Sequence, residues 1–192
     1  MRAVNEALWA ALAGRRNYPP RRLSAPGPDA LSLERIFEAA AQGPDHGQLQ
    51  PWRFIVVPAA RRADLGEVFA QALAERDPDS DETARARARE KAFHAPCLVV
   101  AVLVDDPEAK KVPVAEKLVS LGCAVQNMLI AAQSLGYASG LASGAAMGSA
   151  GMRDLLRLAP HEGAICFLAF GTASEPRPPR ERPRPADFVT TL

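Results

Sequence analysis

The sequence predicts a single α+β domain. Helical patterns come first, and strand-like runs alternate with helical patterns after them. The chain has 192 residues, enough for one domain with a full core, and no repeat or linker-like change in composition divides it. Its content of 48% hydrophobic and 23% charged residues is ordinary for a globular protein. We therefore expect residues 1–192 to form one layered α+β domain.

Apolar residues recurring every three or four positions predict the helices. Asp29 is a typical N-cap for the second helix, and Gly136 is a typical residue to follow the end of the longest one. The expected helices cover approximately residues 4–14, 29–42, 65–73, 83–93, 115–135 and 152–158.

Short continuous apolar runs predict the strands. They lie at residues 53–57, 98–104 and 164–170, and a further short strand is expected around Leu141. Residues 172–192 are rich in proline and include four arginines. Such a segment stays extended and does not build a core alone, so we expect this tail to pack on a partner subunit.

The helix expected at 115–135 is apolar on nearly every side. Its charged residues are Glu116 and Lys117, both at its start. A helix of this kind must be covered all round. In a chain this short, a second copy is a natural part of the cover, which predicts a homodimer.

Composition excludes several classes of function. A net charge of +1 gives no electrostatic footprint for nucleic acid or a membrane surface, and no apolar run has the length of a membrane span. Asn5 and Glu6 precede any long apolar stretch, which argues against a secretory signal. The three cysteines lie among apolar residues and indicate reduced thiols in a cytoplasmic protein. Metal-ligand spacings, G-x-G-x-x-G and nucleophile triads are absent from the sequence.

The most informative segment lies between the second helix and the first predicted strand. It reads Gly43-Pro44-Asp45-His46-Gly47-Gln48-Leu49-Gln50-Pro51-Trp52. Proline and glycine fix an irregular backbone path, while amides and an imidazole offer donors and acceptors without fixed charge. Such a loop suits one edge of a planar heterocycle. Piece by piece, it can also be read as a turn followed by a strand that begins with a core indole.

As a whole, this loop resembles the signature loop of the flavin-dependent nitroreductase family, commonly written A-P-S-x-x-N-x-Q-P-W. Pro44, Gln50, Pro51 and Trp52 match it in identity and spacing. The Pro-Asp-His version resembles that of a subgroup of short bacterial members. The resemblance implies a nitroreductase-like α+β sandwich, with a mostly antiparallel sheet surrounded by helices. It also implies a homodimer that uses FMN as cofactor and NAD(P)H as reductant.

The resemblance also implies roles for residues outside the loop. Arg15, Arg16 and Asn17 would hold the flavin phosphate and ribityl chain, although from sequence alone they could be a solvated helix end. Members of the family contact the flavin at positions that correspond here to Gln42 and His46. Gln48 replaces the usual asparagine of the loop and could also reach the ring or ribityl edge.

Two further stretches follow from the same resemblance. Leu141, Ala142 and Ser143 match the strand that passes the flavin, where similar proteins have Trp-Arg-Ser, so the first two positions depart from the pattern. A second stretch aligns with residues that are linked to the nicotinamide nucleotide in related proteins. It comprises Ala131, Ala132, Gln133, Ser134, Leu135 and Gly136. From sequence alone, this stretch is read as buried helix.

The implied activity is hydride transfer from NAD(P)H through flavin N5 to a nitroaromatic, quinone or similar small-molecule acceptor. It requires no protein acid or nucleophile, because the cofactor does the chemistry. Two alternatives stay open: an FMN-holding protein without significant turnover, and a dimeric scaffold that has lost its flavin.

Overall fold

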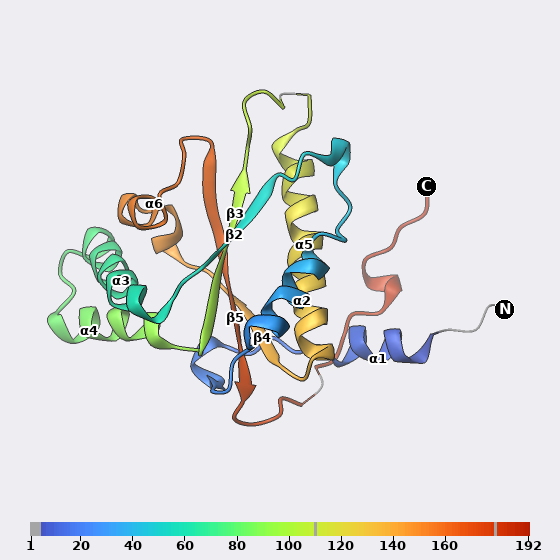
Figure 1. Ribbon diagram of the computed structural model, residues 1–192, viewed down its shortest axis with the longest axis horizontal. Coiled ribbons are helices and arrows are strands. Elements are labelled where there is room, and N and C mark those ends of the chain that lie inside the picture. Colours follow the sequence, from blue (N-terminus) through green and yellow to red (C-terminus); the bar gives the residue numbers. More distant parts are fainter. Residues whose placement is uncertain (1–4, 110, 179) are drawn as a thin grey trace.

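The computed structural model describes residues 5–109, 111–178 and 180–192 (Figure 1). The helices are α1 (Glu6–Gly14), α2 (Ala30–Ala40), α3 (Arg62–Arg76), α4 (Glu82–Glu90), α5 (Val114–Ser134) and α6 (Ala150–Leu156). The strands are β1 (Leu23–Ser24), β2 (Trp52–Val56), β3 (Cys97–Val104), β4 (Ala138–Ala142) and β5 (Glu162–Ala173).

The strands form one five-stranded sheet in which every strand pairing is antiparallel. β5 is the longest strand and is central in the sheet. It pairs with β3, with β4 and, near its C-terminal end, with β1. β2 closes the sheet beyond β3. The expected α+β architecture with a mostly antiparallel sheet is confirmed.

Helices cover both faces of this sheet (Figure 1). α2 and α5 pack on one face, where Val99, Ala101 and Leu103 of β3 join their core. On the other face lie α3, α4 and α6, against alternate residues of β3 such as Val100 and Val102. The run of apolar residues in β3 is explained by this burial on both faces.

α5 has one packed side and one exposed side. Lys117 is only 2% exposed and donates to Asp105 at 2.6 Å, while Leu118 and Val119 beside it lie open. By length and hydropathy α5 is the one helix among the described residues that could cross a membrane, a test that core helices also pass. Its contacts with α2, β3 and β4 show a core helix with one uncovered face.

The predicted elements occur close to their expected positions. The Asp29 cap is confirmed, since its carboxylate accepts from the Ser32 N–H at 2.8 Å. β1 was not expected, because a two-residue strand has too few positions to show any alternation.

Candidate functional site

The residues after α1 run beside β4 and pair with it at one isolated bridge. Tyr18 N–H donates to the Ser139 carbonyl at 3.0 Å, and Asn17 and Ser139 form a parallel bridge. The Asn17 side chain accepts from Leu141 N–H at 2.7 Å and so continues this pairing. The structure therefore brings together Asn17 and the predicted strand 141–143.

Glycine at position 140 permits this close approach. A Cβ atom built on Gly140 would lie 1.9 Å from the Tyr18 carbonyl oxygen, well inside any possible contact. Any larger residue would push the segment that carries Arg15, Arg16 and Asn17 away from the sheet.

Four arginines gather around this segment, namely Arg15, Arg16, Arg177 and Arg182. Arg182 donates to the Arg15 carbonyl at 3.5 Å, and Arg177 donates to the Asn17 carbonyl. Burial, followed by repulsion from Arg182 and Arg16, lowers the pKa of Arg15. Among the described residues, none of the four guanidinium groups has a carboxylate within ion-pair distance. Such a concentration of positive charge favours a bound anion.

Arg16 is only partly satisfied. Its Nη1 donates to the carbonyl oxygens of Ala13 and Arg15, at 2.7 and 3.2 Å, while its buried Nε has no partner in the part of the chain that the structure describes. Because an unpaired buried donor is costly, an oxygen ligand that reached Arg16 Nε would be stabilising.

A cavity of about 330 Å³ adjoins Arg16 on the side of α5. Gln133 and Gly136, from the predicted nicotinamide stretch, line it together with Tyr18 and Ser139. Ala132 is fully buried in the core. This cavity is not lined by the remaining members of that stretch, Ala131, Ser134 and Leu135.

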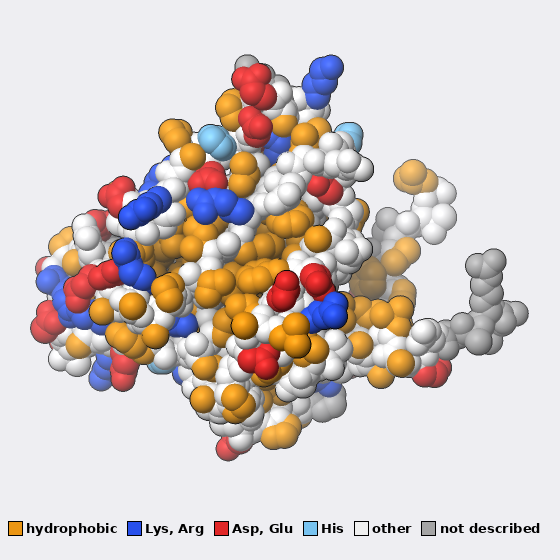
Figure 2. Space-filling model, viewed as in Figure 1, with side chains coloured by type: hydrophobic (Ala, Val, Ile, Leu, Met, Phe, Trp, Pro, Cys, Tyr) orange, Lys and Arg blue, Asp and Glu red, His pale blue; other side chains and the backbone are white. Residues whose placement is uncertain are grey.

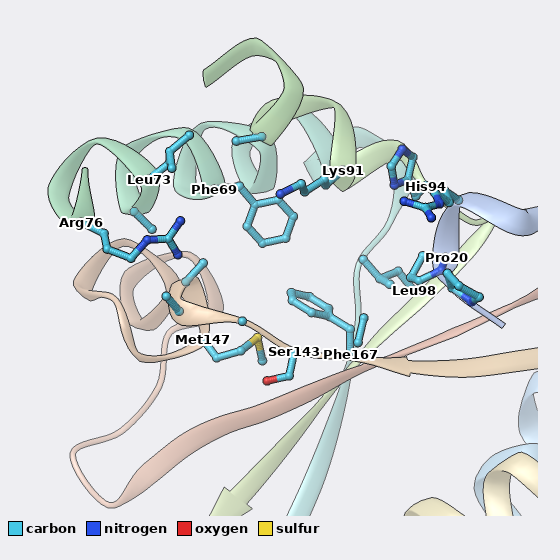
Figure 3. Close-up of a pocket in the computed structure, with 18 residues that line it drawn as sticks. Pro20, Phe69, Leu73, Arg76, Lys91, His94, Leu98, Ser143, Met147 and Phe167 are labelled. Carbon is cyan, nitrogen blue, oxygen red and sulfur yellow. The ribbon is translucent and has the colours of Figure 1, made fainter. Parts of the chain in front are cut away.

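A second cavity, of about 350 Å³, lies at the end of β4 (Figure 3). Ala142 and Ser143 form part of its wall. Leu141 does not line it and is 39% exposed, because successive side chains of a strand point to opposite faces. The predicted residues 141–143 are therefore divided between two sides of β4, with Leu141 on one side and Ala142 and Ser143 at the cavity.

The signature loop lies elsewhere, at the start of α5. His46 Nδ1 and Glu116 Oε2 are 2.6 Å apart, and Ser120 Oγ donates to the Pro44 carbonyl at 2.7 Å. Gln48 adopts a left-handed conformation with φ of 54°, and Gln42 donates to the Glu38 carbonyl at 3.5 Å. These contacts hold the loop in a fixed shape while the side chains of Gln42, His46 and Gln48 stay exposed.

The predicted site residues therefore form two groups at opposite ends of α5. His46 contacts Glu116 in the first turn of this helix, whereas Arg16 shares a cavity with Gln133 in the last turn. At 1.5 Å per residue, the helix separates Glu116 from Gln133 by about 25 Å. One chain brings Arg15, Arg16 and Asn17 to β4, but it does not bring the signature loop to them.

Several charged residues near β4 were not anticipated. Arg177 and Arg182 lie in the proline-rich tail, and Arg76 and Lys91 line the second cavity from α3 and from the turn after α4. The tail arginines have no periodic pattern that would give their direction. The signal for a basic site that the sequence did offer was the presence of four arginines within residues 172–192.

Comparison with known proteins identifies the family of this chain. A sequence model described as the nitroreductase family matches residues 12–172. A protein of Escherichia coli K12 named "Putative NAD(P)H nitroreductase YdjA" is 34% identical over 88% of this chain and 91% of its own length. A Haemophilus influenzae protein with the same provisional activity in its name is 34% identical over 81% of this chain and 83% of its own.

Solved structures show the same fold. The nitroreductase-like family protein from Bacillus cereus has a TM-score of 0.81 at 15% identity, with 100% of this chain and 99% of the other covered. The FMN and NADPH-dependent nitroreductase NfnB from the Sphingopyxis strain HMH has a TM-score of 0.77 at 21% identity, with 96% and 98% covered. The family match over most of the sequence, together with relatives at 34% identity, shows that this chain belongs to the nitroreductase family.

Proposed function

We propose that this protein is an FMN-dependent oxidoreductase that takes hydride from NAD(P)H and reduces a nitroaromatic, a quinone or a similar small molecule. The observation that carries the proposal is the group of four arginines beside β4, for which the described residues supply no carboxylate partner. The names of the E. coli and H. influenzae relatives support NAD(P)H as reductant, and that of NfnB supports FMN.

The residues beside β4 fit the phosphate end of FMN. A phosphate dianion would neutralise Arg15 and Arg182 and would offer an oxygen to the unpaired Nε of Arg16. Arg177 adds a fourth positive charge at the same segment. A single phosphate suits this compact cluster, and the sequence has no G-x-G-x-x-G motif for a dinucleotide.

The flavin ring would extend from this cluster along β4. When bound, FMN supplies hydride acceptance and donation at N5. Leu141 offers an exposed apolar surface for the ring, and Ala142 and Ser143 lie where the strand ends. Gln133 and Gly136 are the members of the predicted nicotinamide stretch that remain accessible for the dinucleotide. The protein's own work is to bind and orient both partners.

A second copy of the chain would complete the site. α1 exposes Leu8, Trp9 and Leu12, and α5 exposes Leu118 and Val119 (Figure 2 shows the apolar side chains on α1). Antiparallel pairing of two α5 helices about a two-fold axis would bring the signature loop of one copy to the arginine cluster of the other. Gln42, His46 and Gln48 would then contact the partner's flavin.

The tail fits the same arrangement. Its first half contacts segment 15–18 of its own chain, whereas Phe188 and Val189 near its end are 67% and 58% exposed. We propose that residues 172–192 continue onto the partner subunit. The three cysteines are unpaired, which supports a cytoplasmic setting, where NAD(P)H is available.

The decisive experiment is the absorbance spectrum of the purified protein. A yellow protein whose colour is bleached by NAD(P)H supports the proposal. Colour that NAD(P)H does not bleach would indicate a flavin holder without turnover, and a protein that remains colourless after incubation with FMN would indicate a scaffold.

The arginine cluster can be tested separately. The variant Arg15→Ala/Arg16→Ala removes two charged contacts to phosphate, so FMN affinity should fall by at least about 100-fold. Arg35→Ala is the matched control, since Arg35 pairs with Glu38 on the surface of α2. Unchanged FMN retention by the double variant would place the phosphate elsewhere.

A further inference from the structure

The side chains of His46 and Glu116 join the signature loop to the first turn of α5. His46 Nδ1 lies 2.6 Å from Glu116 Oε2. An ionised carboxylate can only accept a hydrogen bond, so this contact requires a proton on Nδ1. Among the described residues, His46 is the one histidine of three that pairs with a carboxylate.

This pair adds little to the stability of the fold. The side chains of His46 and Glu116 are 67% and 50% exposed, and ion pairs as exposed as these contribute little to folding. The start of α5 already has a buried anchor, because Lys117 pairs with Asp105 at the end of β3. The effect that is left for Glu116 is the orientation of the His46 ring.

The backbone that carries His46 is held as well. Ser120 Oγ donates to the Pro44 carbonyl, and the Gln50 N–H donates to Asp45 Oδ2 at 2.7 Å. Gln50 itself has a φ of 45°, in the left-handed region that side chains other than glycine adopt at a cost. The loop is therefore fixed around His46 on both sides, and Glu116 fixes the ring.

The bond to Glu116 decides what His46 can offer to a ligand. When the ring is neutral and its proton is on Nδ1, Nε2 has a lone pair and acts only as an acceptor. Nε2 makes no hydrogen bond with any residue that the structure describes. A ligand that contacts this nitrogen must bring an N–H or O–H group, and FMN carries both, in its pyrimidine ring and in its ribityl chain.

We propose that Glu116 is a positioning residue of the flavin site and acts through His46. It keeps the proton of the neutral ring on Nδ1, so that Nε2 accepts a hydrogen bond from the partner's FMN. The inference rests on the proposed function, because it requires a flavin site that the signature loop of a second copy completes. A bare Nε2 is also the physical reason for a His46 that orients the cofactor and donates no proton.

The first test locates the proton by NMR of the full-length protein with ¹⁵N-labelled histidine, recorded without FMN and with saturating FMN. The spectra are taken at about pH 8.5, where a free imidazole is neutral. Because the chain has three histidines, the His46→Gln variant identifies the signals of His46. Wild type should show a proton on Nδ1 and a bare Nε2, and Glu116→Ala should lose this preference.

The second test measures FMN affinity by isothermal titration calorimetry at the same pH. Glu116→Ala and His46→Ala should each weaken FMN binding by about tenfold, the effect of one hydrogen bond. In the His46→Ala background, Glu116→Ala should change the affinity by less than about twofold, because its effect passes through the ring. Thermal unfolding confirms that each variant is folded.

Two further variants separate this role from a general effect of charge. Glu116→Gln keeps an acceptor oxygen for the Nδ1 proton, so it should retain the wild-type tautomer and most of the FMN affinity. Glu90→Ala is the matched control, since it removes an exposed carboxylate at the end of α4, on the other side of the sheet (Figure 1). It should leave both measurements unchanged.

Three results would overturn the inference. The first is a proton on Nε2 of wild-type His46, and the second is an unchanged tautomer in Glu116→Ala. The third is an equal loss of FMN affinity from Glu116→Ala with and without His46, which would be an effect of charge at the start of the helix. A wild-type protein that binds no FMN would overturn the proposed function as well, and the wild-type spectrum alone reveals this, so the two failures are distinguishable.

Discussion

At the scale of single residues, the pair of Arg53 and Glu162 joins β2 to the start of β5. Arg53 donates to both carboxylate oxygens of Glu162, at 2.6 and 2.7 Å. These bonds lower the pKa of Glu162 from 4.5 to about 2. Because the folded pKa is below the unfolded one, the stabilisation is complete above the unfolded pKa and is lost as the pH falls toward 2.

Arg53→Met should therefore lower the free energy of unfolding by about 2 kcal/mol at pH 7. The difference from wild type should shrink between pH 4.5 and pH 2, measured by urea unfolding at several pH values. Arg35→Met, which removes an exposed ion pair, should change the free energy of unfolding by less than about 0.5 kcal/mol. A pH-independent effect of Arg53→Met would show that packing, and not charge, is responsible.

His46 is the second residue with a clear test. Its Nδ1 is engaged by Glu116, which fixes the orientation of the ring and leaves Nε2 as its other polar atom. We expect His46 to contact the partner's flavin as a positioning group and not to donate an essential proton.

His46→Gln should consequently retain FMN with modestly altered redox behaviour. Stopped-flow measurement of the oxidative half-reaction is the check. A general acid typically contributes ~10²–10⁴-fold. A loss of this size, with FMN fully bound and the reductive half-reaction unchanged, would identify His46 as a catalytic acid.

At the scale of elements, the contact between β4 and segment 15–18 positions the proposed cofactor site. Gly140→Ala places a Cβ atom 1.9 Å from the Tyr18 oxygen. Separation of the two segments should follow, with a loss of stability of about 3 kcal/mol and of FMN binding. Gly148→Ala is the control, since a Cβ there meets no atom of the described residues within 4 Å. Thermal unfolding and flavin content measure both effects, and full FMN binding by Gly140→Ala would contradict this role.

At the scale of the whole molecule, the exposed apolar residues of α1 and α5 are expected to be covered by a second copy. An obligate interface of this kind buries more than about 2,000 Å² in total. Val119→Glu places a charge on this surface, where the side chain is 65% exposed in the single chain. It should yield a monomer that binds FMN weakly, because the site would lack the partner's loop.

Analytical ultracentrifugation at low micromolar concentration measures this outcome. Phe93→Glu is the matched control, because Phe93 is 60% exposed in the turn after α4, on the opposite side of the sheet. A wild-type protein that stays monomeric, or a Val119→Glu variant that remains a dimer, would contradict the proposal that two subunits form the flavin site through this surface.

The sequence by itself determined the order and type of the main elements. Periodicity located the long helices and β3, and Asp29 marked the start of α2, because these signals depend on neighbouring residues alone. The signature loop led to the right family for a similar reason, since its identity is carried by a few consecutive positions.

Only the tertiary structure decided which residues meet. Arg177 and Arg182 reach Asn17 and Arg15 across most of the chain, and His46 lies at the far end of α5 from them. Neither arrangement has a local signal, because contacts between distant residues depend on how the elements pack. The placement of β4 beside segment 15–18 likewise depends on the small size of Gly140, whose role is visible only once its neighbour is in place.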